Sequence, residues 1–419
     1  MFCPMTRTER TYHWLFSLYC FSWSVLGPMY ALFLLSRGLD LFQMSAVPAI
    51  YFITTFLFEV PTGAVADLMG RKLSFLLSCV IRMVAFGLYA FAHGFADCVI
   101  AEFVDALGST WATGALDAWA VDGMAAEGDR RPTDRFFARA HMRARALMIV
   151  SSLVSGYLAQ RDMRLPWLVG AFGFALTAAV AAVLMRETGP QHAAGSWAGV
   201  HRSLGRAVGE GLAAVRQAPV LLVLCGLTMA GAFGAMPATM LWQPRIQALS
   251  GEGTWLMGWI SAALNVTSLA GSAMISRVLG RVSRERMLCA AALWRATMFA
   301  VVGLAAGVGP ALAGLLLQEM SFGMTEPLVQ AWMNEHIAAE RRATVLSVRA
   351  MFFTLGASAG LVCIGLLARD FGMRTAWLAS AGVFAFVAFG FVLLGRLASS
   401  PSAARADAAP LSPTVAPGV

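Results

Sequence analysis

The chain has 419 residues, of which 58% are hydrophobic and only 13% are charged, and its formal net charge at pH 7 is +8. Its mean hydropathy of +0.69 excludes an ordinary soluble domain, because a soluble core of this size does not need so much apolar surface. The lipid bilayer is therefore the expected solvent.

Twelve apolar runs follow one another along the chain. Each is long enough, or nearly so, to cross a hydrocarbon core of about 30 Å as a helix that rises about 1.5 Å per residue. Polar turns separate the runs, which favours helices over the strands of a barrel. The runs cover residues 12–35, 46–66, 73–92, 97–124, 143–160, 165–185, 219–243, 255–276, 287–306, 309–334, 345–367 and 373–396.

The basic residues are distributed unevenly between the two ends of these runs. If both termini lie on one side, 23 of the 31 Lys and Arg residues lie on that side and 6 on the other. This bias follows the positive-inside rule. It predicts a multi-pass protein of the cell inner (plasma) membrane with both termini in the cytoplasm. The net charge is thereby explained as a topology signal, and no nucleic-acid partner is needed.

The longest polar connection lies near the middle of the chain. It divides the sequence into a first half of six runs and a second half of six runs, and a Pro-, Ala- and Ser-rich tail follows the last run. The predicted domains are residues 1–185, the cytoplasmic linker 186–217, residues 218–398 and a disordered cytoplasmic tail 399–419.

An internal repeat supports this division. The segment 117–127 reads DAWAVDGMAAE and resembles QAWMNEHIAAE at 330–340, at the ends of the fourth and tenth runs. Arg82 and Arg295 fall at similar depths in the third and ninth runs. Two six-helix halves with corresponding positions are therefore expected.

The turn between the second and third runs carries a recognisable pattern, G-x-x-x-D-x-x-G-R-K, within EVPTGAVADLMGRK from residue 59. We expect Gly63 to permit close helix approach and Gly70 to permit a tight turn. Asp67 is suited to a helix N-terminus or an arginine, and the two basic residues hold the loop on the cytoplasmic side. The pattern positions are Gly63, Asp67, Gly70, Arg71 and Lys72.

This loop resembles the signature loop between helices 2 and 3 of the major facilitator superfamily (MFS) of secondary transporters, including bacterial small-molecule and drug efflux permeases. The resemblance implies an all-α integral membrane protein with the MFS fold, in which 12 transmembrane helices form two pseudo-symmetric six-helix halves. It implies secondary active transport of a small organic molecule by alternating access, without enzyme activity. It also implies that Asp67 engages the start of the eleventh helix, near residues 342–347, in the outward-facing state.

Charged residues inside the apolar runs are the second clue to function. Each costs at least about 2.5 kcal/mol at mid-bilayer, so each should face a partner or a wet cavity. One expected structural pair joins Arg82 to Glu59 or to Asp105. The predicted buried charge partners are Glu59, Arg82 and Arg295.

The resemblance places helices 1, 4, 7 and 10 around a central cavity, which makes carboxylates of the fourth and tenth runs candidates for proton coupling. Glu326 and Asp105 are the first choices because they lie in opposite halves. Glu326 also precedes Pro327, which predicts a locally broken helix with exposed carbonyl groups. The full candidate set is Glu326, Asp105, Glu102, Asp117 and Glu319.

The same four runs supply aromatic residues and methionine. Such side chains, together with one or two acids, suit an amphipathic or cationic organic substrate. The predicted cavity residues are Trp23, Tyr30, Trp111, Phe233, Met236, Trp242 and Phe322.

Other functions remain open at this stage. Proton-coupled efflux is the main hypothesis, and proton-coupled uptake of a nutrient or metabolite is the alternative, because the fifth run lacks the proline that drug antiporters of the superfamily usually carry. A polytopic membrane enzyme is a remote alternative, since only Asp117 and Asp122 form an aspartate pair and diphosphate chemistry needs clustered aspartates around Mg²⁺. We expect no metal and no cofactor, a small-molecule substrate and protons as partners, and a monomer in the lipid bilayer.

Overall fold

The computed structural model describes residues 5–129, 133–187, 216, 218–251, 253–278, 282–337 and 339–398. These residues are helical almost throughout, and the described part contains no β-strand. The helices are α1 (Arg7–Ser24), α2 (Tyr30–Ser36), α3 (Leu41–Met69), α4 (Arg71–Ala90), α5 (Phe95–Ala112), α6 (Ala115–Ala126), α7 (Asp134–Arg161), α8 (Leu165–Leu184), α10 (Pro219–Ser250), α11 (Thr254–Val278), α12 (Arg284–Leu304), α13 (Val308–His336) and α14 (Ala339–Ala398).

All twelve predicted runs are helical, but two of them are interrupted. The first run divides into α1 and α2 around Pro28, which has no backbone N–H to continue a helix. The fourth run divides into α5 and α6 at Gly114, whose φ of 71° is left-handed. The eleventh and twelfth runs are the two limbs of α14, which reverses direction at Gly372 with φ 85°.

The predicted break at Pro327 is wrong. Pro327 lies inside α13, which continues as one helix from Val308 to His336. Membrane helices tolerate proline when neighbouring helices or local adjustments satisfy the freed backbone groups. The tenth run is therefore continuous, whereas the fourth run, its counterpart in the first half, is broken.

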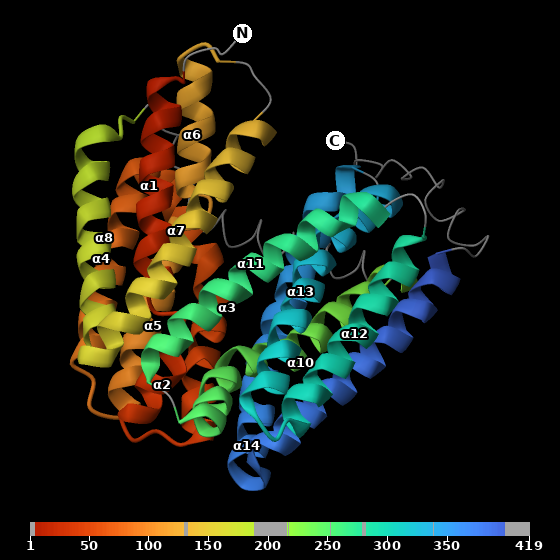
Figure 1. Cartoon of the computed structure of the whole chain (residues 1–419). Coiled ribbons are helices and arrows are strands. Elements are labelled where there is room, and N and C mark those ends of the chain that lie inside the picture. Colours follow the sequence, from red (N-terminus) through yellow and green to blue (C-terminus); the bar gives the residue numbers. More distant parts are fainter. Residues whose placement is uncertain are drawn as a thin grey trace, which may run out of the picture.

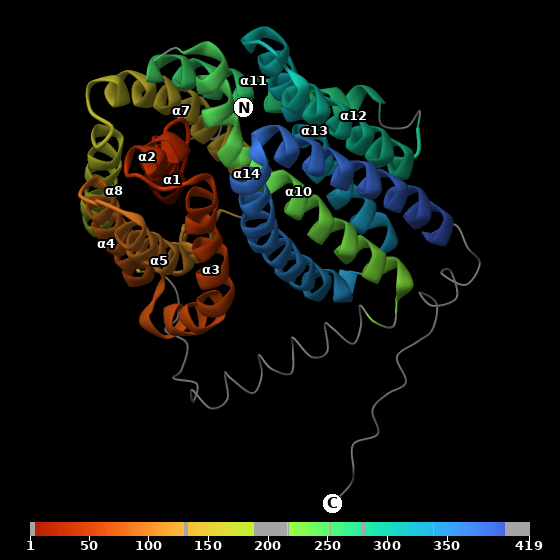
Figure 2. The same ribbon diagram turned by 90° about the horizontal axis from the view of Figure 1, so that it is seen from below.

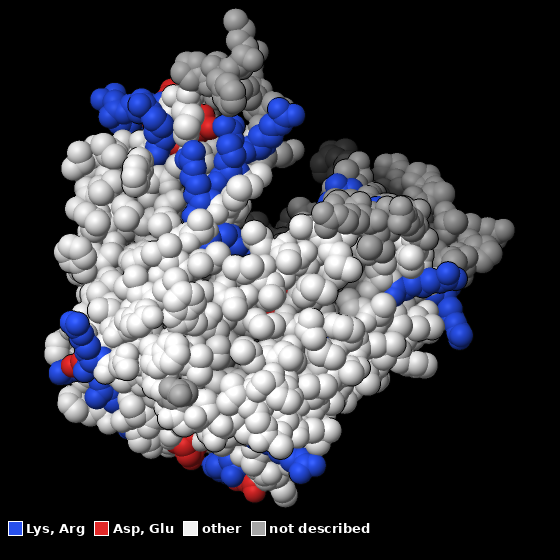
Figure 3. Space-filling view, viewed as in Figure 1, with Lys and Arg blue, Asp and Glu red and all other residues white. Residues whose placement is uncertain are grey.

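The helices meet the requirements of a membrane protein. Six stretches of described helix are long and apolar enough to cross a membrane by length and composition. The last of them, Val345–Leu397, counts as one stretch although it contains both limbs of α14. The space-filling view shows basic and acidic side chains gathered at the two ends and a largely uncharged surface between them (Figure 3).

The helices form two bundles, α1 to α8 and α10 to α14, that pack against each other along two contacts. α3 packs on the first limb of α14, and α7 packs on α11 (Figures 1 and 2). A Cβ added to Gly156 would lie 3.0 Å from Cα of Gly258, and one added to Gly365 would lie 2.7 Å from Cβ of Ser45. These close approaches need glycine and form a seam between the halves.

The start of α1 and the end of α14 lie at the same end of the molecule, which we call the terminal face (Figure 1). The seam glycines and serine lie toward the opposite end, near the starts of α3 and α11. At the terminal face a notch separates the two bundles (Figure 3). The predicted linker lies almost wholly outside the described residues, and the predicted tail lies wholly outside them.

Candidate functional site

A cavity of about 680 Å³ lies mainly within the first bundle and reaches α10 of the second. The interruptions of the first and fourth runs both line it, through Gly27 and Gly114. Its size is that of a typical small-molecule site. Its wall combines tyrosine and tryptophan rings with the carboxylates of Glu102, Asp105 and Asp117.

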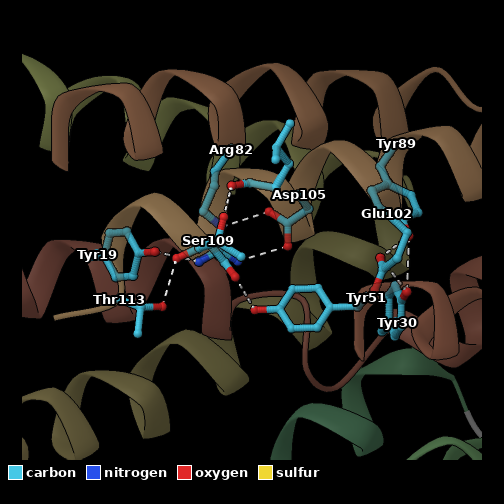
Figure 4. A network of polar contacts seen from close by, with 11 residues as sticks. Tyr19, Tyr30, Tyr51, Arg82, Tyr89, Glu102, Asp105, Ser109 and Thr113 are labelled. Atoms are coloured by element: carbon cyan, nitrogen blue, oxygen red, sulfur yellow. Dashed lines mark hydrogen bonds and ion pairs between the residues drawn. The ribbon is translucent and has the colours of Figure 1, made fainter. Parts of the chain in front are cut away.

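Glu102 on α5 is buried, with 6% of its surface exposed. Its Oε2 accepts a hydrogen bond of 2.8 Å from the hydroxyl of Tyr30 and another from the hydroxyl of Tyr89 (Figure 4). The ring of Tyr89 stacks on Trp167 with centroids 3.9 Å apart. No ion pair involves Glu102 within the described residues, so tyrosine hydroxyls take the place of a cation.

One turn further along α5, Asp105 forms a two-point ion pair with Arg82 of α4. Arg82 Nε donates to Oδ1 at 2.8 Å and Nη2 donates to Oδ2 at 3.0 Å, while Nη1 donates to the hydroxyl of Tyr19 at 2.9 Å (Figure 4). Arg82 and Asp105 are 6% and 7% exposed. Of the two partners that the sequence allowed for Arg82, Asp105 is the one that binds it.

Nearer the terminal face, Asp117 is exposed to the same cavity. Its Oδ1 accepts a hydrogen bond of 2.6 Å from the hydroxyl of Tyr12. Tyr51 of α3 donates to the hydroxyl of Ser109 at 2.8 Å, one turn beyond Asp105 on α5 (Figure 4). Tyrosine hydroxyls thus contact Glu102, Ser109 and Asp117 of the fourth run.

A second cavity, of about 460 Å³, lies between α10, α12, α13 and α14. Its lining is mostly apolar, with Arg295, Glu326 and Arg349 as its charged residues. Glu326 is exposed and forms an ion pair with Arg349 of the first limb of α14. It also accepts a hydrogen bond of 3.2 Å from Gln330.

Arg295 on α12 is 5% exposed, and its guanidinium lies over the rings of Phe322 and Phe384, at 5.1 and 4.9 Å from their centroids. Its Nε and Nη2 are buried without a hydrogen-bond partner. The predicted buried residue is confirmed, but no carboxylate of the described residues forms an ion pair with it. Glu319 is half-buried and accepts instead from the side chain of Gln318 at 2.9 Å.

Glu59 was expected to be a buried charge partner, and this is wrong. Its side chain is exposed on α3, and it has no hydrogen bond or ion pair to any described residue. Arg82, its expected partner, lies on α4 with its guanidinium taken by Asp105 and Tyr19. The apolar character of the run concealed that this face of α3 turns toward open space.

The predicted aromatic and methionine residues divide among several places. Trp23 and Tyr30 line the first cavity, and Met236 and Phe322 line the second. Phe233 lines a separate hollow between α10 and α14, Trp242 is buried in the apolar core, and Trp111 is half-buried outside both cavities. The last three positions do not support a role in the cavities.

The loop after α3 turns at Gly70, whose φ of 92° confirms the predicted tight turn. The carboxylate of Glu187, which follows α8, accepts from the backbone N–H groups of Arg71 at 2.9 Å and Lys72 at 3.1 Å. Lys72 Nζ donates to the carbonyls of Ala182 and Met185, both at 2.8 Å. An anion therefore caps the start of α4 and a cation caps the end of α8.

Two other positions of the loop have different outcomes. The expectation that Gly63 permits a close helix approach is wrong for the described residues, because a Cβ added there would meet none of their atoms within 4 Å. The side chain of Asp67 lies outside the described part of the structure, so its contact with the eleventh helix stays a prediction.

The tyrosines are the site residues that sequence reasoning missed. Tyr19, Tyr51 and Tyr89 were not candidates, yet Tyr51 and Tyr89 donate to polar groups of the first cavity and Tyr19 accepts from Arg82. A signal was present: the chain has 6 tyrosines, and all of them precede residue 158. Such a one-sided distribution of an amphipathic residue indicates a polar network in one half.

Two helix bundles that join at one end, with cavities that place charged side chains among apolar helices, define a helical membrane transport protein. The family model of the Major Facilitator Superfamily matches residues 14–257 and 255–416. The chain therefore belongs to the Major Facilitator Superfamily, and it is a transporter rather than an enzyme.

Individual relatives agree with this assignment. An uncharacterized MFS-type transporter of Bacillus subtilis (strain 168), YxaM, is 23% identical over 358 residues, which cover 83% of this chain and 86% of that protein. The crystal structure of the nucleoside transporter NupG has a TM-score of 0.78 at 14% identity and covers 93% of this chain and 100% of that one. A POT family transporter in complex with a thioalcohol-conjugated peptide has a TM-score of 0.73 at 12% identity, with 94% and 97% covered. At these identities the solved structures show a shared fold.

Proposed function

We propose that this protein exports a small organic molecule by alternating access and that Glu102 carries the coupled proton. One observation carries the coupling: Glu102 is a buried carboxylate on the wall of the first cavity, held by two tyrosine hydroxyls and by no cation. Export rather than uptake rests on the resemblance of the loop around Asp67 to those of efflux permeases, so uptake is the alternative to be tested.

The tyrosine pair suits a group that changes protonation state. A hydroxyl both donates and accepts, so Tyr30 and Tyr89 can each donate to an ionised Glu102, and one of them can accept from a protonated Glu102. The two hydroxyls are themselves 3.1 Å apart, which lets the network reorient without losing contact. Asp105 lacks this freedom because both of its oxygens bind Arg82.

The two halves support an alternating-access cycle. By the positive-inside rule the terminal face is cytoplasmic, so this conformation is open toward the cytoplasm and joined at the other end. Across that joined end, Gln243 Nε2 donates to the carbonyl of Gly27 at 2.7 Å and its Oε1 accepts from the N–H of Ala31 at 2.9 Å. These bonds satisfy the backbone between α1 and α2 and must break when the other end opens.

The closing of the cytoplasmic end is proposed to bring Glu59 to Arg349. Ser45, Phe52 and Glu59 follow at steps of seven residues, so they share one face of α3. Ser45 packs on Gly365 and Phe52 lies 6.3 Å from Phe353, centroid to centroid.

Because α3 and the first limb of α14 run in opposite directions, the next step along α3 faces the turn before Phe353, where Arg349 lies. Arg349 is bound to Glu326 of its own half in this conformation. This would explain why Glu59 has no ion pair to a described residue in this conformation: its proposed partner, Arg349, lies across the notch. Arg349 would then exchange its ion pair with Glu326, within one half, for an ion pair with Glu59, between the halves.

The transport proposal is tested with purified protein in proteoliposomes, with a panel of organic cations, acids and neutral molecules and an imposed pH gradient. Glu102→Gln keeps the shape but cannot titrate, so gradient-driven flux should fall to the level of protein-free vesicles while downhill exchange persists. Asp370→Asn, an exposed pair at a helix turn, is the matched control. Driven flux unchanged in Glu102→Gln would remove Glu102 as the proton site.

The direction of transport and the closing of the cytoplasmic end are each measured separately. Flux measured in vesicles of both orientations distinguishes export from uptake. The double variant Glu59→Cys with Arg349→Cys should cross-link only when substrate or gradient closes the cytoplasmic end. Glu59→Cys with Phe371→Cys, at the far end of the same limb, should not cross-link. Equal cross-linking of both pairs would contradict the proposed register.

A further inference from the structure

The two halves place an arginine at corresponding positions but treat it differently. The spacing of 213 residues that separates Trp119 from Trp332 also separates Arg82 from Arg295. Both arginines are buried, each on the apolar run that precedes the run with the tryptophan: the third before the fourth, and the ninth before the tenth. The same spacing carries Asp105, the counter-ion of Arg82, onto Gln318.

Without this counter-ion, Arg295 lacks the two hydrogen bonds that Arg82 donates to Asp105. Arg82 uses Nε and Nη2 to hold the two oxygens of Asp105. In Arg295 the same two atoms, Nε and Nη2, are buried and donate to nothing. Gln318 does not replace the carboxylate, because its amide donates to Glu319.

The other charged groups near Arg295 do not fill this place. Glu319 acts on Arg295 electrostatically but forms no ion pair with it. Glu326 is bound to Arg349. Arg295 thus lines a cavity of about 460 Å³, with its guanidinium near the rings of Phe322 and Phe384 and its buried Nε and Nη2 without a partner among the described residues.

We propose that the second cavity binds the carboxylate of a small organic anion with an apolar body, and that Arg295 is its ligand. This rests on the transport function proposed above and specifies its substrate class. A carboxylate on Nε and Nη2 would copy the Arg82–Asp105 pair, in which the fork of the guanidinium matches both oxygens. The apolar body would lie against the apolar wall that includes Leu288, Phe322 and Phe391.

A monoanion fits this site better than a phosphate dianion. Arg295 supplies one free positive charge, and the second arginine of the cavity is neutralised by Glu326. The charges of Arg349 and Glu326 therefore cancel, and the positive charge of Arg295 remains for the ligand. The rings of Phe322 and Phe384, which both line the cavity near the guanidinium, favour a flat apolar body next to the carboxylate.

The test measures equilibrium binding to the full chain in lipid nanodiscs, without any gradient. The probes are 2-naphthoate, its neutral amide and 2-naphthyl phosphate. We expect 2-naphthoate to bind, and the amide to bind about 10- to 100-fold more weakly, as the loss of charge-assisted hydrogen bonds requires. Arg295→Lys, which keeps the charge but loses the fork, should weaken 2-naphthoate by at least about tenfold.

A second variant keeps the test informative if changes of Arg295 impair folding. Gln318→Asp supplies the intramolecular counter-ion of the first half and should abolish 2-naphthoate binding while Arg295 stays in place. Equal binding of acid and amide, or unchanged binding in Gln318→Asp, would overturn the site. Tighter binding of the phosphate would overturn the carboxylate assignment.

These outcomes are separate from those of the coupling test. Loss of driven flux in Glu102→Gln without 2-naphthoate binding would leave transport standing and remove the anion site. Specific 2-naphthoate binding with unaffected driven flux in Glu102→Gln would keep the anion site and remove Glu102 as the proton site.

Discussion

The two halves of this transporter share a backbone plan but distribute polar chemistry in opposite ways. In the first half the buried charges are satisfied internally: Asp105 holds Arg82, and tyrosine hydroxyls hold Glu102. In the second half the corresponding arginine has two free donors beside a mostly apolar cavity. A pseudo-symmetric fold therefore does not imply pseudo-symmetric sites. The first half pairs its buried arginine with a carboxylate, whereas the second half leaves two donors of its buried arginine without a partner among the described residues.

The difference extends to the backbone. The first and fourth runs are interrupted where they line the first cavity, at Gly27 and Gly114, whereas α10 and α13 continue through their prolines. Interrupted helices expose carbonyl and N–H groups inside the membrane, which is tolerated where protein or a wet cavity satisfies them. Gln243 satisfies one such interruption from across the seam.

The largest expected effect comes from removing the internal counter-ion of the first half. Asp105→Asn leaves the buried guanidinium of Arg82 without its charge partner and should destabilise the protein by about 3–5 kcal/mol. The change at the corresponding position of the second half, Gln318→Asp, should raise stability instead, because it gives Arg295 a counter-ion. Unfolding of both variants in one detergent, followed by tryptophan fluorescence, checks the sign. Equal destabilisation of both variants would contradict the view that Arg82 has a counter-ion and Arg295 lacks one.

The next effect concerns the seam between the halves. Gln243→Leu leaves the buried N–H of Ala31 without a partner, at about 1–3 kcal/mol, and removes the side-chain donor to the carbonyl of the exposed Gly27. Because these bonds exist only while this end is joined, the population should move about tenfold or more toward the conformation open at the other end. Labelling of Ser45→Cys, buried at the seam, should increase in a cysteine-free background.

Tyr30→Phe is the matched control for the seam. Tyr30 lies 213 residues before Gln243 in the sequence, but its hydroxyl binds Glu102 within its own half. Its loss should weaken proton coupling without changing the labelling of Ser45→Cys. Increased labelling in Tyr30→Phe as well would mean that the seam responds to any loss near the first cavity.

Much of the fold was predictable because its signals are strong and local. Twelve apolar runs of membrane length leave few alternatives to helices, and the repeat around Trp119 and Trp332 identifies the halves. The breaks were less predictable. Pro327 carries a clear breaking signal but sits in a continuous helix, while the break at Gly114 depends on a left-handed glycine that sequence alone does not distinguish from the chain's other glycines.

The candidate site was predictable in residue type and less so in partners. Glu102, Asp105 and Arg295 were identified because charge inside an apolar run is costly. Which charged residue is paired depends on helix rotation, which periodicity in an apolar run does not reveal: Glu59 is exposed, and Arg295 has no ion pair within the described residues. Glu187 was missed because a polar residue after a helix is unremarkable until its contact with the start of α4 is seen.

A smaller effect is expected at that contact. Glu187→Ala removes the anion that caps α4 and both of its hydrogen bonds to Arg71 and Lys72. Because the group is exposed, the loss should be about 0.5–1 kcal/mol. Glu187→Gln, which keeps an acceptor, should lose less. Melting of the two variants at low and high salt checks this, and a loss independent of salt in Glu187→Gln would argue against a role for the charge.

The smallest effect compares the turns that join α7 to α8 and the two limbs of α14. Each turn holds an exposed Asp–Arg pair, Asp162 with Arg164 and Asp370 with Arg369. Hydrogen bonds from Arg164 lower the pKa of Asp162 from 3.8 to about 2, and hydrogen bonds from Arg369 lower the pKa of Asp370. A carboxyl whose pKa is lowered by folding stabilises the protein above its unfolded pKa, and this contribution disappears as the pH falls through the folded pKa.

The melting difference between wild type and Asp162→Asn should therefore be constant from pH 7 to about 4.5 and shrink as the pH approaches about 2. It should also shrink in high salt, because both partners are exposed. Asp370→Asn should behave in the same direction, since its turn occupies the corresponding place in the second half. A difference that grows on acidification in either variant would mean that the ionised carboxyl destabilises the fold. The two turns would then differ in the effect of their Asp–Arg pairs, contrary to this prediction.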